Sequence, residues 1–131
     1  MRFIQVTIYG QAFAGKGDLF DWEPLTTKRL IRPLKQDPNG TRTSGVRVFG
    51  DSMIGDGIFD GDYLIYLHST IASPNSIVVL QSPYGILVKR FSPQSDGTIR
   101  LMSSNPDHKD QVWPATEIKL IGIVKRLERD Y

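Results

Sequence analysis

The stretch VRVFGDSMIGDGIFDGDYLIYL, residues 46–67, decides how this chain folds. Two runs in it, Val46–Phe49 and Tyr63–Leu67, are rich in β-branched and aromatic residues and predict strands, because such side chains suit a pleated, half-buried backbone. Between them glycine and aspartate recur from 50 to 62, which is typical of turns. The stretch therefore predicts two strands joined by a turn-rich loop, with Ser52 just past the first strand.

The same strand pattern recurs along the rest of the chain. Four further segments show it: Phe3–Tyr9, Ile77–Leu80, Ile86–Phe91 and Ile118–Leu127. Glycine and proline are spread so that few stretches longer than about ten residues lack a turn signal. No segment has a sustained helical repeat, although Leu25–Leu34 has room for a turn or two of helix. We expect a mainly β fold, a compact twisted sheet with little helix.

Length and composition indicate one folded domain. The chain has 131 residues, of which 40% are hydrophobic and 23% charged, close to the average of globular proteins. Single domains usually span about 100 to 200 residues, so a two-domain enzyme is not expected. The formal net charge of +2 permits a nucleic-acid partner without requiring one.

Several classes of chemistry are excluded or disfavoured by composition. The chain has no cysteine, which excludes disulfides, thiolate metal sites and cysteine nucleophiles and favours a cytoplasmic location. His68 and His108 stand far apart, and the aspartates between residues 50 and 62 are interpreted as turn residues, so we expect no metal and no cofactor. Apolar runs are shorter than the roughly 18 residues of a membrane helix, so we expect no membrane partner.

A basic band covers residues 28–47, with six lysines and arginines against one aspartate. Such a band is able to contact phosphate groups. It lacks the interleaved aromatic residues and the helical pattern of many nucleic-acid sites, so a solvated surface is the simpler interpretation. Both interpretations stay open at this point.

Ser52 and Lys89 are the candidate catalytic pair. A serine beside a glycine at a strand end can present its hydroxyl and nearby backbone N–H groups, those of Ser52 and Met53, to one incoming carbonyl. Neither histidine has a convincing context as its base. Lys89 lies in a predicted strand between Leu87 and Phe91 on one face, where burial would favour the neutral amine.

Each of these residues alone has a commoner explanation, a turn for the serine and an edge or snorkelling position for the lysine. Together, 37 positions apart, they resemble the self-cleaving serine peptidases typified by the LexA repressor and the UmuD mutagenesis protein. The resemblance extends to a late loop at Ser103–Pro106 and a closing strand at Ile118–Val124. It implies the fold of the LexA C-terminal domain, which is also similar to that of signal peptidases.

The resemblance also implies a reaction. Members of this family cut their own chain at a small residue followed by glycine near the start of the domain, and here Ala14-Gly15 offers such a bond. The expected domains are an N-terminal arm, residues 1–14, and a peptidase domain, residues 15–131. Neutral Lys89 would take the proton of Ser52 as the serine attacks the Ala14 carbonyl. The alternative is that Ala14-Gly15 is only a turn.

The partners implied by the resemblance follow from the short N-terminal segment. Fourteen residues leave no room for a helix-turn-helix, so direct sequence-specific DNA binding is not expected and the chain is closest to UmuD. That relationship implies a homodimer, a RecA filament as activator and an error-prone DNA polymerase as partner. The alternative function is a non-catalytic dimerisation or interaction module, such as a phage-repressor C-terminal fragment, pairing through a strand edge at Ile118–Leu127.

Overall fold

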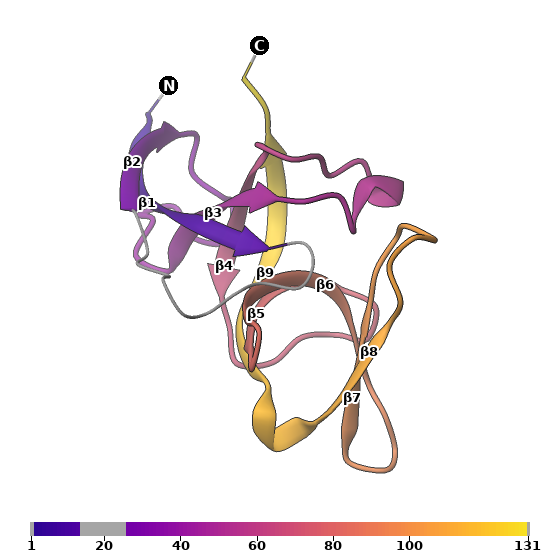
Figure 1. The fold of residues 1–131 in the computed structure, drawn as a ribbon. Helices are drawn as coiled ribbons and strands as arrows, with labels where there is room; N and C mark the ends of the chain where they lie inside the picture. Colours follow the sequence, from indigo (N-terminus) through magenta and orange to yellow (C-terminus); the bar gives the residue numbers. More distant parts are fainter. Residues whose placement is uncertain (1, 14–25, 131) are drawn as a thin grey trace.

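The computed structural model describes residues 2–13 and 26–130, and within these it shows nine strands in one sheet (Figure 1). The strands are β1 (Ile4–Phe13), β2 (Thr26–Ile31), β3 (Thr43–Phe49), β4 (Tyr63–His68), β5 (Ile77–Ser82), β6 (Gly85–Pro93), β7 (Thr98–Met102), β8 (Gln111–Pro114) and β9 (Lys119–Glu128). The described part of the chain contains no α-helix, only two short 3₁₀ turns, η1 (Ile54–Asp56) and η2 (Ala115–Glu117). The predicted mainly β fold is confirmed.

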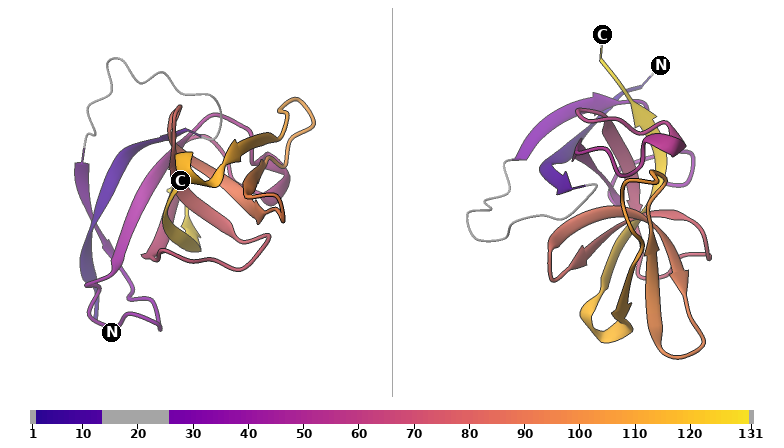
Figure 2. Two further views of the ribbon diagram at one scale, coloured as in Figure 1. Left: turned by 90° about the horizontal axis from the view of Figure 1, so that it is seen from below. Right: turned by 45° about the vertical axis from the view of Figure 1, so that its right-hand side comes forward.

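The sheet curls back on itself. Its order is β2-β1-β3-β4-β9-β5-β6-β7-β8, and β1 also pairs with β6. That extra pairing closes a ring of strands, β1, β3, β4, β9, β5 and β6, while the β7–β8 hairpin extends from it (Figures 1 and 2). The ring brings the last residue of β3, Phe49, close to Leu87 in β6, because Phe13 of β1 pairs with both, although the two strands are far apart in sequence.

The expectation of helix within Leu25–Leu34 is wrong. Residues Thr26–Ile31 form β2, which runs antiparallel to β1 with Ile31 opposite Ile4. Threonine and isoleucine are β-branched and favour extended backbone. Pairing with β1 also satisfies the backbone N–H and C=O groups that a helix would have paired internally.

Among the described residues, the core side chains form three clusters. The cluster beneath the candidate site contains Val46, Val48, Met53, Ile58, Leu64, Tyr66, Val79 and Val88. The second contains Ile4, Val6, Ile8, Ile31, Leu34 and Ile65. The third contains Val78, Leu80, Leu87, Ile99 and Leu101. Because neighbouring residues of a strand point to opposite faces, the burial of both Leu87 and Val88 shows that β6 is covered on both sides.

Strand β9 lies inside the sheet, between β4 and β5. The interpretation of Ile118–Leu127 as a sheet edge is therefore wrong, because Gly122 and Ile123 pair with both neighbouring strands. Gly122 allows the close approach: a Cβ there would lie 2.5 Å from the Tyr66 ring. The two end strands of the described sheet are β2 and β8.

Candidate active site

Ser52 lies in the loop that joins β3 to β4, residues 50–62, here called the serine loop. Its ends are closed by backbone bonds, from Gly61 N–H to the Val48 oxygen at 2.7 Å and from Val48 N–H to the Asp62 oxygen at 2.9 Å. The Asp60 carboxylate accepts a hydrogen bond from the Gly50 N–H. The Asp62 carboxylate accepts one from the Phe59 N–H at 2.7 Å. Both carboxylates thus hold the turn, as the sequence indicated.

Lys89 reaches Ser52 from β6. Its Nζ lies 2.8 Å from Ser52 Oγ, and Ser52 and Lys89 are 0% and 1% exposed. The neighbours on its face of the strand, Leu87 and Phe91, pack in the third core cluster. The structure therefore brings together the two residues that the sequence paired across 37 positions.

Burial changes the acid–base behaviour of this lysine. Removal from water disfavours the ammonium and lowers the pKa of Lys89 from 10.5 to about 8, while the negative charge of Asp110 raises that pKa and partly opposes the effect. With a pKa of about 8, roughly a tenth of the molecules carry the neutral amine at pH 7. A neutral amine can accept a proton from a serine hydroxyl.

A third segment completes the site. The late loop, predicted at Ser103–Pro106, extends over residues 103–110 in the structure and follows β7. Ser103 Oγ accepts a hydrogen bond from Lys89 Nζ at 2.9 Å. Sequence reasoning identified this loop only by resemblance and missed the contact. The β6–β7 register contains the signal: Arg90 lies opposite Met102, so Ser103 continues the hairpin opposite Lys89.

The late loop also holds the backbone of the nucleophile segment. Ser104 N–H donates to the Ser52 oxygen at 2.8 Å, and Gly55 N–H donates to the Ser104 oxygen at 2.8 Å. The Asn105 side-chain amide donates to the Asp51 oxygen at 3.0 Å. The serine loop and the late loop therefore form one hydrogen-bonded unit.

Two backbone donors near Ser52 remain available. The loop bonds engage the N–H groups of Gly50, Ile54 and Asp56, whereas no acceptor among the described residues takes the N–H of Ser52 or Met53. Met53 itself is 0% exposed and packs in the core cluster beneath the loop. Two free N–H groups beside a hydroxyl can bind one carbonyl oxygen.

Both histidines have other partners. His68 Nε2 lies 2.8 Å from Ser44 Oγ, and burial lowers the pKa of His68. His108 Nε2 lies 2.6 Å from the Asp51 carboxylate. Within the described ranges, the side chain in contact with the Ser52 hydroxyl is Lys89, so the geometry is that of a serine–lysine pair.

Strand β1 ends beside this pair. Phe13 lies opposite Phe49 in β3 and opposite Leu87 in β6, parallel to both strands. Ser52 follows Phe49 by three residues, and Lys89 follows Leu87 by two. The predicted bond Ala14-Gly15 lies outside the described residues, but the strand that precedes it points toward the pair.

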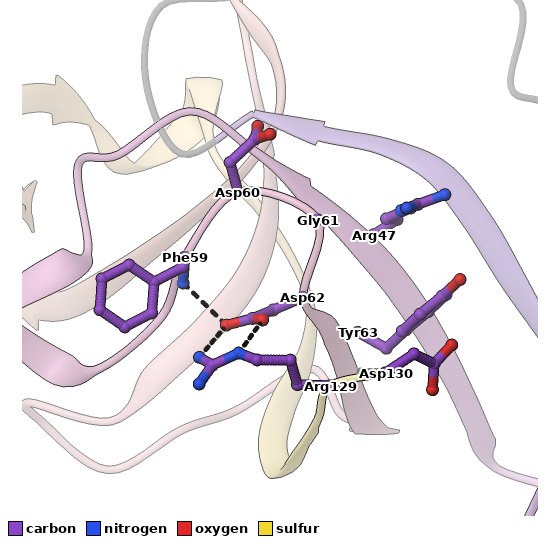
Figure 3. A pocket seen from close by; sticks show the side chains of 8 residues that line it. All are labelled: Arg47, Phe59, Asp60, Gly61, Asp62, Tyr63, Arg129 and Asp130. Atoms are coloured by element: carbon purple, nitrogen blue, oxygen red, sulfur yellow. Dashed lines mark hydrogen bonds and ion pairs between the residues drawn. The ribbon is translucent and has the colours of Figure 1, made fainter.

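The basic band is largely engaged in contacts within the protein. Arg29 binds Glu128 and Asp130, and the Arg47 guanidinium lies 5.3 Å from the centre of the Tyr63 ring. Arg47 and Tyr63 belong to a pocket of about 490 Å³ between the serine loop and the end of β9 (Figure 3). Acidic groups also line this pocket, so it offers no uniform positive surface for phosphate.

Metal-binding clusters and membrane-spanning helices were sought in the described ranges. No group of three or more histidine, aspartate or glutamate side chains there is arranged to hold a metal ion. None of the helical segments in residues 2–13 and 26–130 has the length and apolar character needed to span a membrane.

The fold and the site define an all-β domain with a buried serine–lysine pair at the meeting point of three strands. Residues 7–125 match the Peptidase S24-like family, and the chain belongs to that family of serine peptidases.

Curated relatives carry the name LexA repressor. The chain is 32% identical over 124 residues to that of Sorangium cellulosum (strain So ce56), covering 92% of this chain and 53% of the relative. It is 38% identical over 130 residues to the LexA repressor of Caldicellulosiruptor saccharolyticus, a match that covers 95% of this chain and 60% of the relative. LexA repressor 2 of Pseudomonas putida (strain KT2440) is 44% identical over 79 residues, a match that covers 60% of this chain and 39% of the relative. The chain thus spans about half the length of such relatives.

Proposed function

We propose that this chain is a self-cleaving serine peptidase that cuts its own Ala14-Gly15 bond with Ser52 and Lys89. The observation that carries the proposal is the 2.8 Å contact between Lys89 Nζ and Ser52 Oγ, with both residues excluded from solvent. A lysine whose charge is disfavoured by burial can act as the base that a serine nucleophile needs. Membership of the serine peptidase family supports the same reaction.

The reaction proceeds in two halves. Neutral Lys89 accepts the Ser52 proton as Oγ bonds to the Ala14 carbonyl carbon, and the carbonyl electrons move to its oxygen. The tetrahedral intermediate collapses, the bond to Gly15 nitrogen breaks, and the Lys89 ammonium gives its proton to that nitrogen. Water then attacks the acyl-enzyme, Lys89 accepts the proton of the water, and Ser52 leaves with a proton from Lys89.

The backbone stabilises the charged intermediate. The N–H groups of Ser52 and Met53, which have no acceptor among the described residues, are the proposed oxyanion donors. Donors fixed in position before the reaction lower the barrier because they need no reorganisation as charge develops. The bonds from the late loop to the Ser52 and Asp51 carbonyls keep this segment in place.

The end of β1 supports Ala14-Gly15 as the bond and favours cleavage within one molecule. Phe13, the last described residue before the proposed bond, is paired with β6, which carries Lys89, and with the end of β3, which the loop of Ser52 follows. Glycine after the scissile bond places no side chain against the nucleophile. Cleavage within one molecule is independent of protein concentration.

The biological role we propose is that of a UmuD-like protein of the DNA-damage response, located in the cytoplasm and acting in error-prone DNA synthesis. The proposed partners are a second copy of the chain, a RecA filament that accelerates cleavage, and a DNA polymerase. The similarity to LexA repressors supports the DNA-damage context. The competing proposal is a non-catalytic interaction module, for which neutral Lys89 has no use.

Incubation of the purified chain between pH 7 and pH 10 tests the proposal. Denaturing mass spectrometry should show residues 15–131 and a 14-residue peptide, with a rate that rises about tenfold from pH 7 to pH 9 and then levels off, because the pKa of Lys89 is about 8. Rates at two protein concentrations should agree, and an activated RecA filament should raise the rate at neutral pH.

Ser52→Ala and Lys89→Ala should remain uncut under all these conditions. Lys89→Arg separates the two candidate functions, because arginine stays charged and cannot act as the base. A wild-type chain that stays intact at pH 10 and with RecA would contradict the peptidase proposal and leave the interaction module. A cut at another bond would contradict only Ala14-Gly15.

A further inference from the structure

Strand β1, which precedes the proposed cleavage bond, is an integral part of the sheet. It pairs with β2 from Ile4 to Tyr9, with β3 from Ile8 onward, and with β6 at Phe13. In the sequence these residues read as an arm that cleavage removes. In the structure they occupy an interior position between β2 and β3.

The slot that holds β1 is fitted to its side chains. Ile4, Val6 and Ile8 alternate along the strand and are 8%, 3% and 1% exposed, packed in the second core cluster. Two glycines make room for the isoleucines. A Cβ on Gly40 would lie 2.4 Å from the Ile4 methyl group, and a Cβ on Gly45 would lie 2.4 Å from that of Ile8. The slot therefore selects both length and shape at these positions.

Hydrogen bonds to β2 and β3, and one side-chain hydrogen bond on the outer face, also bind β1 to the sheet. Lys28 Nζ in β2 donates a hydrogen bond to Thr7 Oγ1 at 2.7 Å. The two edges of the strand also satisfy backbone groups that would otherwise be left unpaired in β2 and β3. Cutting the peptide bond after residue 14 breaks none of these contacts.

We propose that cleavage leaves β1 bound as a separate strand, and that the slot between β2 and β3 is a binding site for an extended segment with aliphatic residues at alternate positions. This inference rests on the proposed self-cleavage for its biological meaning. The occupant after the cut is the chain's own residues 4–13, and residues 15–131 lose that strand only when another strand of the same pattern replaces it. Cleavage makes the release of β1 possible, but the peptide leaves only when a second strand replaces it.

The retained strand is detected by comparing native and denaturing conditions. After self-cleavage at pH 9, native mass spectrometry and size-exclusion chromatography should show the 14-residue peptide travelling with residues 15–131, and urea should separate them. An isotope-labelled synthetic peptide of residues 1–14 should replace the bound one over hours, whereas a scrambled peptide of the same composition should not. Loss of the peptide from the folded cut chain in native buffer would overturn the proposal.

Variants in β1 separate specific retention from non-specific adherence. Val6→Ala and Ile8→Ala should accelerate release of the peptide at least tenfold, because each removes contacts with the slot. Gln5→Ala, at an exposed position of the same strand, is the matched control and should release it at the wild-type rate. Equal release from Val6→Ala, Ile8→Ala and Gln5→Ala would contradict a fitted slot.

A second way of cutting keeps this test independent of self-cleavage. A recognition sequence for an unrelated protease, inserted after Gly15 in a Ser52→Ala chain, allows the same connection to be cut from outside. If β1 stays bound in that externally cut chain while the wild-type chain remains uncut at pH 10, the self-cleavage proposal is contradicted and the proposed strand-binding site is supported. Release of β1 from the externally cut, folded chain would remove the strand site whatever the wild type does.

Discussion

Ser103 and Lys89 face each other across the β6–β7 hairpin, and Lys89 Nζ donates a hydrogen bond to Ser103 Oγ at 2.9 Å. A neutral amine has two N–H groups and one lone pair. If one N–H is held by Ser103, rotation about the Cε–Nζ bond is restricted and the lone pair can stay directed at Ser52 Oγ. Ser103 therefore restrains the amine that the proposed function makes the base for Ser52.

Ser103→Ala should slow self-cleavage about tenfold to a hundredfold even on the high-pH plateau, since small errors in position are costly. The pKa of Lys89 should fall, because the lost acceptor favoured the ammonium. A residue that acted only through that pKa would give faster cleavage at pH 7. The pH profile of the cleavage rate, measured by denaturing mass spectrometry, distinguishes an effect on the position of the Lys89 amine from an effect on its pKa alone.

Ser103→Thr, which retains a hydroxyl, should recover most of the rate. Ser103→Cys keeps the shape of the side chain with a somewhat larger atom and offers only a weak acceptor, so it should resemble Ser103→Ala. Ser95→Ala, in the exposed turn of the same hairpin, should cleave like the wild type. A threonine variant as slow as the alanine variant would show that Ser103 acts through packing.

Asp110→Asn should shift the acid limb of the pH–rate profile to lower pH. The Asp110 charge raises the pKa of Lys89, so its removal lowers that pKa further and increases the neutral fraction. We expect cleavage a few-fold faster at pH 7, with an unchanged plateau, from the pKa change alone. Asp107→Asn, exposed in the same loop, is the control. An unshifted limb in Asp110→Asn would show that this charge is screened.

Lys89→Met, made in a Ser52→Ala chain, should change how stability depends on pH. The pKa of Lys89 is about 8 in the folded chain against 10.5 for an unburied lysine, so the unfolded chain binds the proton more tightly. Burial of the ammonium thus costs about 3 kcal/mol below pH 8, and that cost fades as the pH rises toward 10.5.

Urea unfolding at pH 7, 8.5 and 10 measures this dependence. The Ser52→Ala parent should gain stability over that range relative to the methionine variant, whereas Lys125→Met, at an exposed position of β9, should follow the parent. Parallel curves for the parent and Lys89→Met would mean that the amine is solvated.

The sequence was informative where the signal was local. The strands around residues 46–67 and the lysine in Ile86–Phe91 stand in strong alternating patterns, so both the fold class and the pair of residues were predictable. Strand β2 was not predicted, and room for a turn or two of helix was left in its place, because its pairing with β1 is visible only in three dimensions. The contact of Ser103 with Lys89 was missed because it depends on the register of one hairpin.

The place of β1 was also beyond the reach of sequence patterns. Alternation predicts a strand at residues 3–9, but not that it lies between β2 and β3 with glycines fitted to its isoleucines. The same holds for the end of the serine loop. Asp62 is held by Arg129, which lies 67 positions further along the chain, so only the folded chain shows the pair.

Arg129→Met should destabilise the chain by about 3 kcal/mol at pH 7, because it leaves a buried charge without its partner. Asp62 is 1% exposed, and Arg129 binds it through Nε at 2.6 Å and Nη2 at 2.7 Å. These hydrogen bonds are the largest cause of the lowered pKa of Asp62, against the opposing effect of burial. The stability they contribute is therefore present above pH 3.8 and lost as the pH falls.

Urea unfolding of the wild type and of Arg129→Met at pH 7 and pH 3 measures this pH dependence. The difference in free energy of unfolding between the two chains should be smaller at pH 3, because the Asp62 carboxylate is then protonated. Arg129→Lys, which keeps the charge but cannot donate two parallel bonds, should fall between them. The serine loop ends at Asp62, so the methionine variant should also cleave more slowly than the lysine variant. Equal stability of all three chains at pH 7 would show that the hydrogen bond from the Phe59 N–H is enough to stabilise the Asp62 carboxylate without Arg129.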